Sequence, residues 1–482
     1  MKNDWSGQSL PHPEGRRPVL GDVGGVDRDH PVQDIVRRGD RLGPLFEMRV
    51  FSQRFVFVGG ARLAAEMCDE SRFHKGHSPA VESLRAFAGD GLFTAYNHEP
   101  NWRLAHDVLM PAFTREAMQR YHPTMLQTLR ELFAMWDAHE GPVDVSSGMT
   151  KLTMETLSRA AFDRDFGSLT EDAPHPFIPA MVSMLSTAQR LGSLAAMPGS
   201  RVLANRLLRQ NRPHMRYIDE LLDGVIDDRR ALGSAGAGDD LLGLMLSTRH
   251  PETGARLDDL NIRRQMLTFL VAGHETTSGA LSLATYYLAT HPDVLARAQA
   301  ETDVILGPDP DAEPTFEQIP KLRYLRRVLD ETLRLWPTAP AFTRSPRQEI
   351  VLSTGHRMRP ADWAIVVIPL MHRDREIWGD DPEAFDPDRF LPEQSRARPP
   401  HVYKPFGTGE RSCIGRQFAL HESILALARM LHRYDVAADP DYELHITERL
   451  TLMPEGFELT LTPRTPALTT SSPDRTSTGA PS

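Results

Sequence analysis

The 482-residue sequence predicts a mainly α-helical fold with a smaller β region, an α+β architecture. Residues 61 to about 230 have mostly helical periodicity, and residues 258–290 form the longest periodic segment in the chain. Beyond residue 335 the pattern changes to short β-branched runs, which are typical of strands. We therefore expect a large helical body, organised around one long helix, with small sheets beside it.

Composition is that of an ordinary globular protein, with 40% hydrophobic and 25% charged residues. The formal net charge of −10 and the absence of a basic stripe argue against a nucleic-acid partner. Only two cysteines are present, Cys68 and Cys413, which indicates a reducing compartment and no disulfide framework. No apolar run approaches the roughly 18 residues of a membrane span. These features predict a soluble, cytoplasmic protein with no membrane span.

The first half of the chain is expected to be helical after a short β element. Residues 1–44 are expected to be irregular apart from a short helix near 31–41, and the alternation in 48–58 predicts a hairpin or sheet edge. Helices are then predicted at 101–113, 115–136, 145–162, 179–191 and 202–229. The Gly/Ala/Asp stretch 233–239 is interpreted as a surface loop, because similar helical composition lies on both sides.

The second half begins with the long helix 258–290, which would extend roughly 50 Å and cross the molecule. A second helix is predicted at 320–335, stopped by Trp336-Pro337. Short strands are predicted at 349–353, 357–358 and 363–368, and a terminal hairpin is predicted to pair 446–453 with 457–461. We expect one domain over 45–462, followed by a disordered Ser/Thr/Pro-rich tail over 463–482.

Cys413 lies in a glycine-rich loop, FGTGERSCIG over residues 406–415, immediately before an amphipathic helical run. Gly407, Gly409 and Gly415 are expected to allow tight turns and close approach to a flat cofactor. The simplest interpretation is a buried free cysteine. A zinc site is disfavoured because no second Cys or His lies at a suitable spacing. A dinucleotide-binding fingerprint is excluded because Ser412 stands where its third glycine would be. A single axial thiolate on haem remains.

The segment AGHETT, residues 272–277, lies in the middle of the long predicted helix although its residues are poor choices for a helix interior. One interpretation is a bend, caused by a threonine hydroxyl bonding to a carbonyl one turn earlier. The alternative is a locally opened helix that forms a groove for a small ligand, with Thr276 as a hydrogen-bond donor and Glu275 as a proton source. His274 does not indicate a metalloprotease, because Ser278 stands where the second histidine would be.

Glu331 and Arg334 lie three residues apart on one predicted helix face. Such a pair is most often solvated and worth only a few tenths of a kcal/mol. Arg389, in a Pro-rich segment before the cysteine loop, offers a second guanidinium. We expect Glu331 to lie between the two arginines and to clamp the segments that flank this loop, which is a structural role.

Trp102, Arg103 and His106 lie on another predicted helix, where Trp102 and His106 are one turn apart. Ordinary amphipathic packing explains this arrangement when the helix is considered alone. If a haem is present, these side chains are donors that can reach its propionates together with Arg411.

The four elements, in this order and spacing, resemble the cytochrome P-450 superfamily of haem-thiolate monooxygenases. The motifs are F-x-x-G-x-x-x-C-x-G, A-G-x-E-T-T, E-x-x-R and P-x-R-F. The stretches FLVAGHETTSG, ETLRLWPTAPAF, IWGDD, KPFG and IGRQFALHE are further similar to the haem domain of bacterial self-sufficient fatty-acid hydroxylases. The likeness covers the chain from about residue 45 to 461.

The resemblance implies the cytochrome P-450 fold, with the long central helix over a haem b (iron protoporphyrin IX) and the cysteine loop on the proximal side. It implies roles for individual residues. The proximal ligand and its shield are Cys413 and Phe406; the proton relay is Glu275 and Thr276; the propionate ligands are Trp102, His106 and Arg411; the substrate pocket includes Phe93, Ala339 and Ala341.

By resemblance, the activity is dioxygen-dependent hydroxylation of an unactivated C–H bond in a hydrophobic, fatty-acid-like substrate. The Arg and Tyr that hold the substrate carboxylate in that subfamily are matched here by Gln53 and Phe57, with only Arg54 nearby. A terpenoid or polyketide-like substrate is therefore an alternative. No flavin or nicotinamide domain is present after residue 461, so either the polar tail is the stub of a fusion linker or the chain is a stand-alone enzyme. We expect the second case, with a separate flavin or iron–sulfur redox partner.

Two other classes remain open. A peroxide-driven or isomerising haem-thiolate enzyme would need no proton relay, and the Glu275–Thr276 pair argues against it. A non-catalytic haem sensor would need no substrate pocket.

Overall fold

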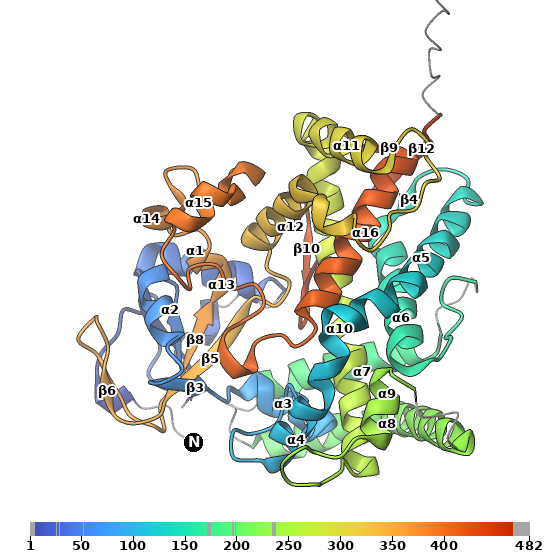
Figure 1. The fold of residues 1–482 in the computed structure, drawn as a ribbon. Helices are drawn as coiled ribbons and strands as arrows, with labels where there is room; N and C mark the ends of the chain where they lie inside the picture. The colour runs from blue at the N-terminus through green and yellow to red at the C-terminus, as the bar shows by residue number, and fades with distance from the viewer. Residues whose placement is uncertain are drawn as a thin grey trace, which may run out of the picture.

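The computed structural model describes residues 5–25, 27, 29–51, 53–170, 175–194, 197, 199–233 and 238–465. Long helices form one side of the molecule and a five-stranded sheet with short helices forms the other (Figure 1). Most of the predicted tail, residues 466–482, lies outside the described residues. Pro463 ends the last strand, and the guanidinium of Arg464 donates to Asp303 at 2.8 Å.

The helices follow the predicted order closely. Their bounds are α1 Pro31–Leu42, α2 Ala61–Met67, α3 Pro79–Ala88, α4 Pro100–Leu109, α5 Arg115–Asp137, α6 Val145–Phe162, α7 Phe177–Leu194, α8 Ser200–Ala231, α9 Leu241–Ser247, α10 Asp259–Thr290, α11 Pro292–Leu306, α12 Arg323–Leu335, α13 Ile368–Met371, α14 Arg375–Trp378, α15 Pro392–Ala397 and α16 Arg416–Arg433. Short 3-10 helices include η1 Trp5–Gly7, η3 Met110–Phe113, η6 Pro387–Phe390 and η7 Gly409–Arg411.

The strands form four small sheets. Their bounds are β1 Leu45–Val50, β2 Gln53–Val58, β3 Phe73–Lys75, β4 Val143–Asp144, β5 Ala341–Pro346, β6 Ile350–Val351, β7 Arg357–Met358, β8 Ala364–Val367, β9 Tyr434–Ala438, β10 Ile446–Glu448, β11 Leu452–Pro454 and β12 Glu458–Pro463. The largest sheet has the order β1-β2-β8-β5-β3, in which only the β2–β8 pair is parallel. The others are β10-β11, β4-β12-β9 and β6-β7.

The long helix α10 is the centre of the helical body. Asp258 caps it by accepting a hydrogen bond from the backbone N–H of Asn261 at 2.8 Å. Most of its side chains are buried, because α6, α12 and α16 all pack against it. Pro292 ends the run, since proline cannot continue the helical hydrogen bonding, and it begins α11 instead. The prediction of a buried central helix is confirmed.

Two details of the predicted secondary structure are wrong. Residues 446–453 do not pair with 457–461: β10 turns back at Arg449 and pairs with β11, while β12 pairs with β9 and β4. Phe457, the residue directly before β12, is fully buried in the core. The helix α11 was not predicted, because Pro292 was interpreted only as a stop.

The N-terminal residues before the sheet are packed onto it. Trp5 is fully buried, and its indole N–H donates to the carbonyl oxygen of Trp363 at 3.2 Å. Leu10 lies in the same hydrophobic cluster, on one face of the five-stranded sheet. In the described part of the chain, no helix is long and apolar enough to cross a membrane.

Candidate active site

The cysteine loop holds Cys413 by its backbone. The N–H of Cys413 donates to the carbonyl oxygen of Phe406 at 2.9 Å, which closes the loop just before α16. Gly407 and Gly409 have φ of +71° and +64°, so both need glycine, and a Cβ at Gly409 would overlap the Glu70 carboxyl group. Gly415 has φ −82°, so the turn itself does not need glycine there, and a Cβ would make only ordinary contacts within the chain; its role in close approach to a cofactor stays a prediction.

The sulfur of Cys413 lies in a recess. Cys413 has exposed surface, yet protein surrounds the thiol, and this desolvation raises its pKa above the ordinary value. The backbone at Gly415 and the charge of Arg416 act in the opposite direction. Burial disfavours ionisation of this thiol when no metal is bound. A bound metal ion would stabilise the thiolate directly. The ring of Phe406 is half-buried beside this loop, with the guanidinium of Arg416 5.5 Å from its centroid.

The AGHETT segment is part of an uninterrupted helix. Thr276 donates its hydroxyl proton to the carbonyl oxygen of Ala272 at 2.7 Å, so the back-bonding interpretation is confirmed. The helix α10 is continuous through this point, so no opening interrupts it. His274 is buried and bonds through Nδ1 to the carbonyl oxygen of Leu270 at 2.5 Å, which explains it without a metal. A Cβ on Gly273 would come within 2.7 Å of the Leu157 side chain, so glycine here allows close packing against α6.

Glu275 and Thr276 differ in their surroundings. Glu275 is buried, and its Oε2 accepts a hydrogen bond from the Thr451 hydroxyl at 3.2 Å. Thr276 is half-buried and Ala272 is exposed, although most of α10 is buried. Exposed small side chains in the middle of a core helix indicate open space beside this face.

Arg411 brings the predicted propionate residues together. Its guanidinium donates to the carbonyl oxygens of Leu92 and Ala95, both at 3.2 Å, and lies 4.1 Å from the ring centroid of Trp102. Trp102 in turn stacks on His106, with centroids 5.2 Å apart. Burial lowers the pKa of Arg411 to about 10. Among the described residues Arg411 forms no ion pair.

Two further basic residues lie at this point and were not predicted from the sequence. The ammonium of Lys75, at the end of β3, donates to the carbonyl oxygen of Phe93, and burial together with Arg411 lowers its pKa to about 7. Burial and the nearby cations lower the pKa of His77 to about 4. Neither ring nitrogen of His77 forms a hydrogen bond with the described residues, although Nδ1 lies 4.0 Å from the Glu82 carboxylate. No sequence motif places Lys75 and His77 beside Arg411, which is more than 300 residues away.

The three predicted pocket residues are exposed although their neighbours are largely buried. Phe93 is 47% exposed, and the ammonium of Lys75 lies 4.7 Å from its ring centroid. Ala341 begins β5, which pairs with β3, the strand that ends at Lys75. Ala339 follows Thr338, whose carbonyl oxygen accepts from the N–H of Leu452 at 3.1 Å.

These residues fit a haem. Cys413 offers one sulfur ligand from a recess, which suits a metal whose other equatorial ligands come from a macrocycle. Arg411 and Lys75 lie close together, and neither forms an ion pair with the described residues, so both can bind carboxylates at the edge of such a cofactor.

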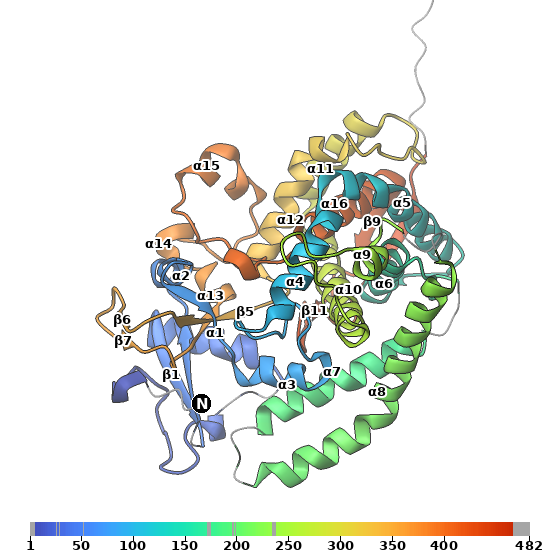
Figure 2. The ribbon, with the colours of Figure 1, turned by 60° about the horizontal axis from the view of Figure 1, so that its bottom comes forward.

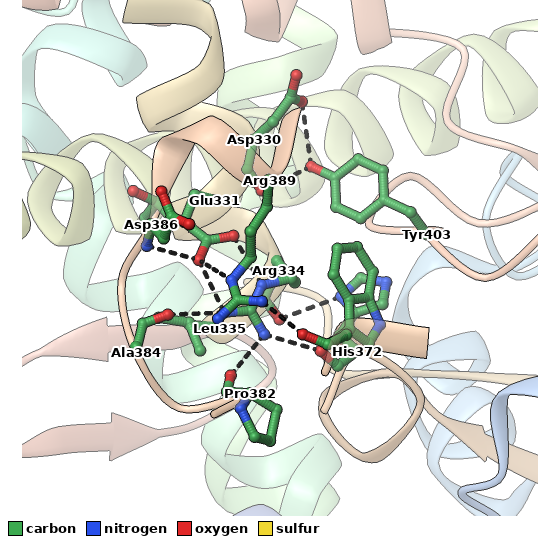
Figure 3. A network of polar contacts seen from close by, with 12 residues as sticks. Asp330, Glu331, Arg334, Leu335, His372, Pro382, Ala384, Asp386, Arg389 and Tyr403 are labelled. Carbon is green, nitrogen blue, oxygen red and sulfur yellow. Dashed lines mark hydrogen bonds and ion pairs between the residues drawn. The ribbon is translucent and has the colours of Figure 1, made fainter. Parts of the chain in front are cut away.

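Glu331 lies between two arginines, as expected (Figure 3). Arg334 donates to both carboxylate oxygens of Glu331, at 2.7 and 2.8 Å, while the Nε of Arg389 lies 3.5 Å from one of them. Arg334 also donates to the carbonyl oxygens of Pro382 and Ala384 in the segment that leads to the cysteine loop. The arrangement connects α12 to this segment, and its role as a clamp stays a prediction.

Arg54 is not placed to bind a substrate carboxylate in place of the Arg and Tyr that Gln53 and Phe57 replace. It is buried and forms an ion pair with Glu47, which is itself buried and also pairs with Arg16 at 2.6 Å. Gln53 and Phe57 lie on the opposite face of β2 from Arg54, because side chains alternate along a strand.

A thiol in a recess, a central helix bearing Glu275 and Thr276, and a basic edge define a haem-binding protein with a thiolate ligand. Comparison with known sequences specifies the family. The sequence model described as Cytochrome P450 matches residues 11–461, and the chain belongs to this family. Its members bind haem, so haem is the cofactor of this chain.

Curated relatives are P450–reductase fusions. The chain is 43% identical over 94% of its length to the bifunctional cytochrome P450/NADPH–P450 reductase 1 of Bacillus subtilis, of which it covers 42%. It is 41% identical over 95% of its length to the corresponding bifunctional protein of Bacillus cereus, of which it also covers 42%. A self-sufficient cytochrome P450 monooxygenase of Aspergillus niger is 38% identical over 93% of the chain. The chain thus spans about two fifths of the length of these relatives.

The expectation of a separate redox partner is contradicted by these comparisons. The bifunctional relatives carry a reductase in the same polypeptide, as their names state, the Aspergillus relative is named self-sufficient, and the chain matches only part of each of them. The expectation was based on the lack of a flavin or nicotinamide domain after residue 461. That lack is not informative for a chain that matches only part of its relatives.

Proposed function

We propose that this chain is a haem-thiolate monooxygenase that hydroxylates an unactivated C–H bond of a hydrophobic, fatty-acid-like substrate. The cofactor would be haem b, and electrons would come from NADPH through a reductase of the kind named in the relatives. One observation supports the proposal most: Cys413 is exposed in a loop that its own N–H closes on the Phe406 carbonyl oxygen. The reaction consumes the substrate, dioxygen, two electrons and two protons, and yields the alcohol and water.

Haem, when bound, supplies the oxygen-activating chemistry, to which a thiolate ligand contributes electron density. The chain supplies the ligand, a basic edge and protons. Cys413 would ligate iron, with Phe406 limiting access of water to the sulfur. Trp102, His106 and Arg411 would hold the haem carboxylates.

Protons would reach the site from Thr276 and Glu275. The hydroxyl of Thr276 donates to Ala272 in this structure and can rotate about χ1 to donate elsewhere. Glu275 accepts from Thr451, which orients its carboxylate one residue from Thr276. Both groups lie on α10, so the position of the donor is fixed by a rigid element.

Turnover with isotopic oxygen tests the reaction. The chain is combined with NADPH and a purified NADPH–P450 reductase, and hydroxylation of medium-chain fatty acids and alcohols is measured under ¹⁸O₂. We expect one labelled oxygen atom in each product. Product formed with peroxide but never with the reductase would reject the proposal, and so would a product whose oxygen comes from water.

A terpenoid or polyketide-like substrate is the second candidate, because the face of β2 that carries Gln53 offers no cation. The side chains on this face of β1 and β2 are Phe46, Met48, Val50, Gln53, Phe55 and Phe57. The affinity for a fatty acid is compared with the affinity for the alcohol of the same chain length. The spin-state shift of the haem on titration measures both affinities and so distinguishes the two substrate classes. Without a cation the two ligands should bind about equally, and Gln53→Arg should favour the acid. A strong preference of the unmodified chain for the acid would reject the second candidate.

A further inference from the structure

One carboxylate is shared by two histidines next to the basic edge of the site. Asp107, on α4, accepts from His106 Nδ1 through Oδ1 at 3.0 Å and from His250 Nε2 through Oδ2 at 3.1 Å. His250 belongs to the turn that follows α9, which packs beside α4 (Figures 1 and 2). The contact therefore connects two segments that are distant in the sequence.

The backbone fixes which nitrogen of His250 carries the proton. Its Nδ1 accepts from the N–H groups of Glu252 and Thr253, at 3.3 and 3.2 Å. An Nδ1 that accepts is unprotonated, so the proton of the neutral ring is on Nε2, the atom that faces Asp107. The ring is only 7% exposed, and the N–H of Gly254 closes the turn on the His250 carbonyl at 2.9 Å. His250 is thus a donor held in place by its own turn.

Asp107 is a charged acceptor. Burial acts to raise the pKa of Asp107, but the hydrogen bonds from His106 and His250 and the charge of Arg103 outweigh it, and the pKa is lowered overall. Arg103 lies 3.8 Å from Oδ1 and also pairs with Glu410 at 3.4 Å. The carboxylate is therefore ionised at neutral pH and accepts from both rings.

His106 is held from two sides. It donates through Nδ1 to Asp107, and its ring stacks on Trp102, with planes 29° apart. Its Nε2 makes no hydrogen bond to the described residues. The charged groups around it are Asp107 and Arg103 on α4, with Glu410 and Arg411 on the cysteine loop. Among these groups, Asp107 is the carboxylate in contact with the ring of His106.

We propose that Asp107 and His250 are positioning residues for the haem. They fix the orientation of His106 and keep a proton on Nδ1, while Nε2 faces a haem carboxylate to which it donates when it carries a proton. A carboxylate behind an imidazole has these effects generally, in metal sites and in catalytic triads. The inference rests on the proposed haem-binding function and adds two residues that no motif indicated.

Haem transfer to apomyoglobin tests the inference without using activity. The ferric holoprotein is compared with Asp107→Asn, His106→Phe and the double variant. We expect about tenfold faster haem loss for either single variant, as for loss of a hydrogen bond to a charged group. The double variant should lose haem no faster than His106→Phe alone, because Asp107 acts through His106. Additive effects would show a separate structural role and overturn the inference.

A charge control and a His250 variant sharpen the test. Asp228→Asn removes an exposed carboxylate of α8 that pairs with Arg164 at 3.4 Å, and it should leave haem loss unchanged. His250→Asn should lose haem faster than the unsubstituted protein but more slowly than Asp107→Asn, because His250 acts on His106 through Asp107. Unchanged haem loss in both Asp107→Asn and His250→Asn would overturn the inference.

The tautomer of His106 is also measurable in the unsubstituted protein. Nitrogen NMR of ¹⁵N-histidine should show Nδ1 of His106 protonated; an unprotonated Nδ1 would overturn the inference even if the variants do not fold. The reduced, carbon monoxide-bound spectrum is recorded for each sample. A thiolate spectrum in the unsubstituted protein, together with unchanged haem loss in the variants, rejects this inference alone. Absence of the thiolate spectrum from the unsubstituted protein rejects the proposed function.

Discussion

Replacing Arg334 by methionine should be among the most destabilising single changes in this chain. Both side chains of the Arg334–Glu331 pair are 0% exposed. Arg334→Met leaves the Glu331 carboxylate with the Asp386 N–H at 2.9 Å and Arg389 at 3.5 Å. Breaking a buried pair by removing one partner costs about 3–5 kcal/mol.

Three backbone carbonyls, those of His372, Pro382 and Ala384, also lose a donor. Each such loss costs roughly 1 kcal/mol. We therefore expect the free energy of unfolding to fall by about 6–8 kcal/mol, a large part of the 5–15 kcal/mol that is typical of a domain.

Urea titration of the purified variants, followed by tryptophan fluorescence and circular dichroism, measures this change. Arg357→Met is the matched control, because Arg357 and Glu349 pair at 2.6 Å but are 57% and 50% exposed. It should cost less than about 1 kcal/mol. The double variant Glu331→Leu, Arg334→Met removes the unpaired charge, so it should be more stable than Arg334→Met alone. Equal losses for Arg334→Met and Arg357→Met would refute the reasoning.

The site and its support give three further predictions. Thr276→Ala removes the hydroxyl that bonds to Ala272, so NADPH consumption should release peroxide at the expense of product; unchanged coupling would remove Thr276 from the proton relay. Burial raises the pKa of Glu422 to about 8, so the stability that this group contributes is complete below pH about 4.5 and is lost as pH rises to about 8. The stability of Glu422→Gln relative to the unsubstituted protein should accordingly increase over that range, and a constant difference in urea titrations would contradict this. Gly409→Ala should cost more than about 1 kcal/mol, because of its positive φ and the overlap with Glu70; thermal unfolding at the wild-type temperature would argue against the loop geometry.

Local features of the site were predictable because short-range physics determines them. Gly407 and Gly409 are needed for positive φ within a few residues of Cys413. The hydroxyl of Thr276 bonds one turn back along the same helix, as its position in α10 requires. The long helix itself follows from periodicity and from Pro292.

Contacts between distant segments were not predictable in this way. Lys75 meets Phe93 and Arg411 only because β3 pairs with β5 and the loop before α16 folds back on α4. His250 reaches Asp107 from a separate turn. The pairing of β12 with β9 depends on which strand edges are free, and the hydrophobic pattern of either strand alone does not specify it.

The ligand of the haem iron is the central claim, and the absorption spectrum of the reduced, carbon monoxide-bound protein tests it most directly. Ligation by Cys413 predicts the strongly red-shifted Soret band of thiolate-bound haem, and its loss in Cys413→Ser. A Soret band at the position typical of histidine-ligated haem, or a thiolate band that persists in Cys413→Ser, would contradict the assignment.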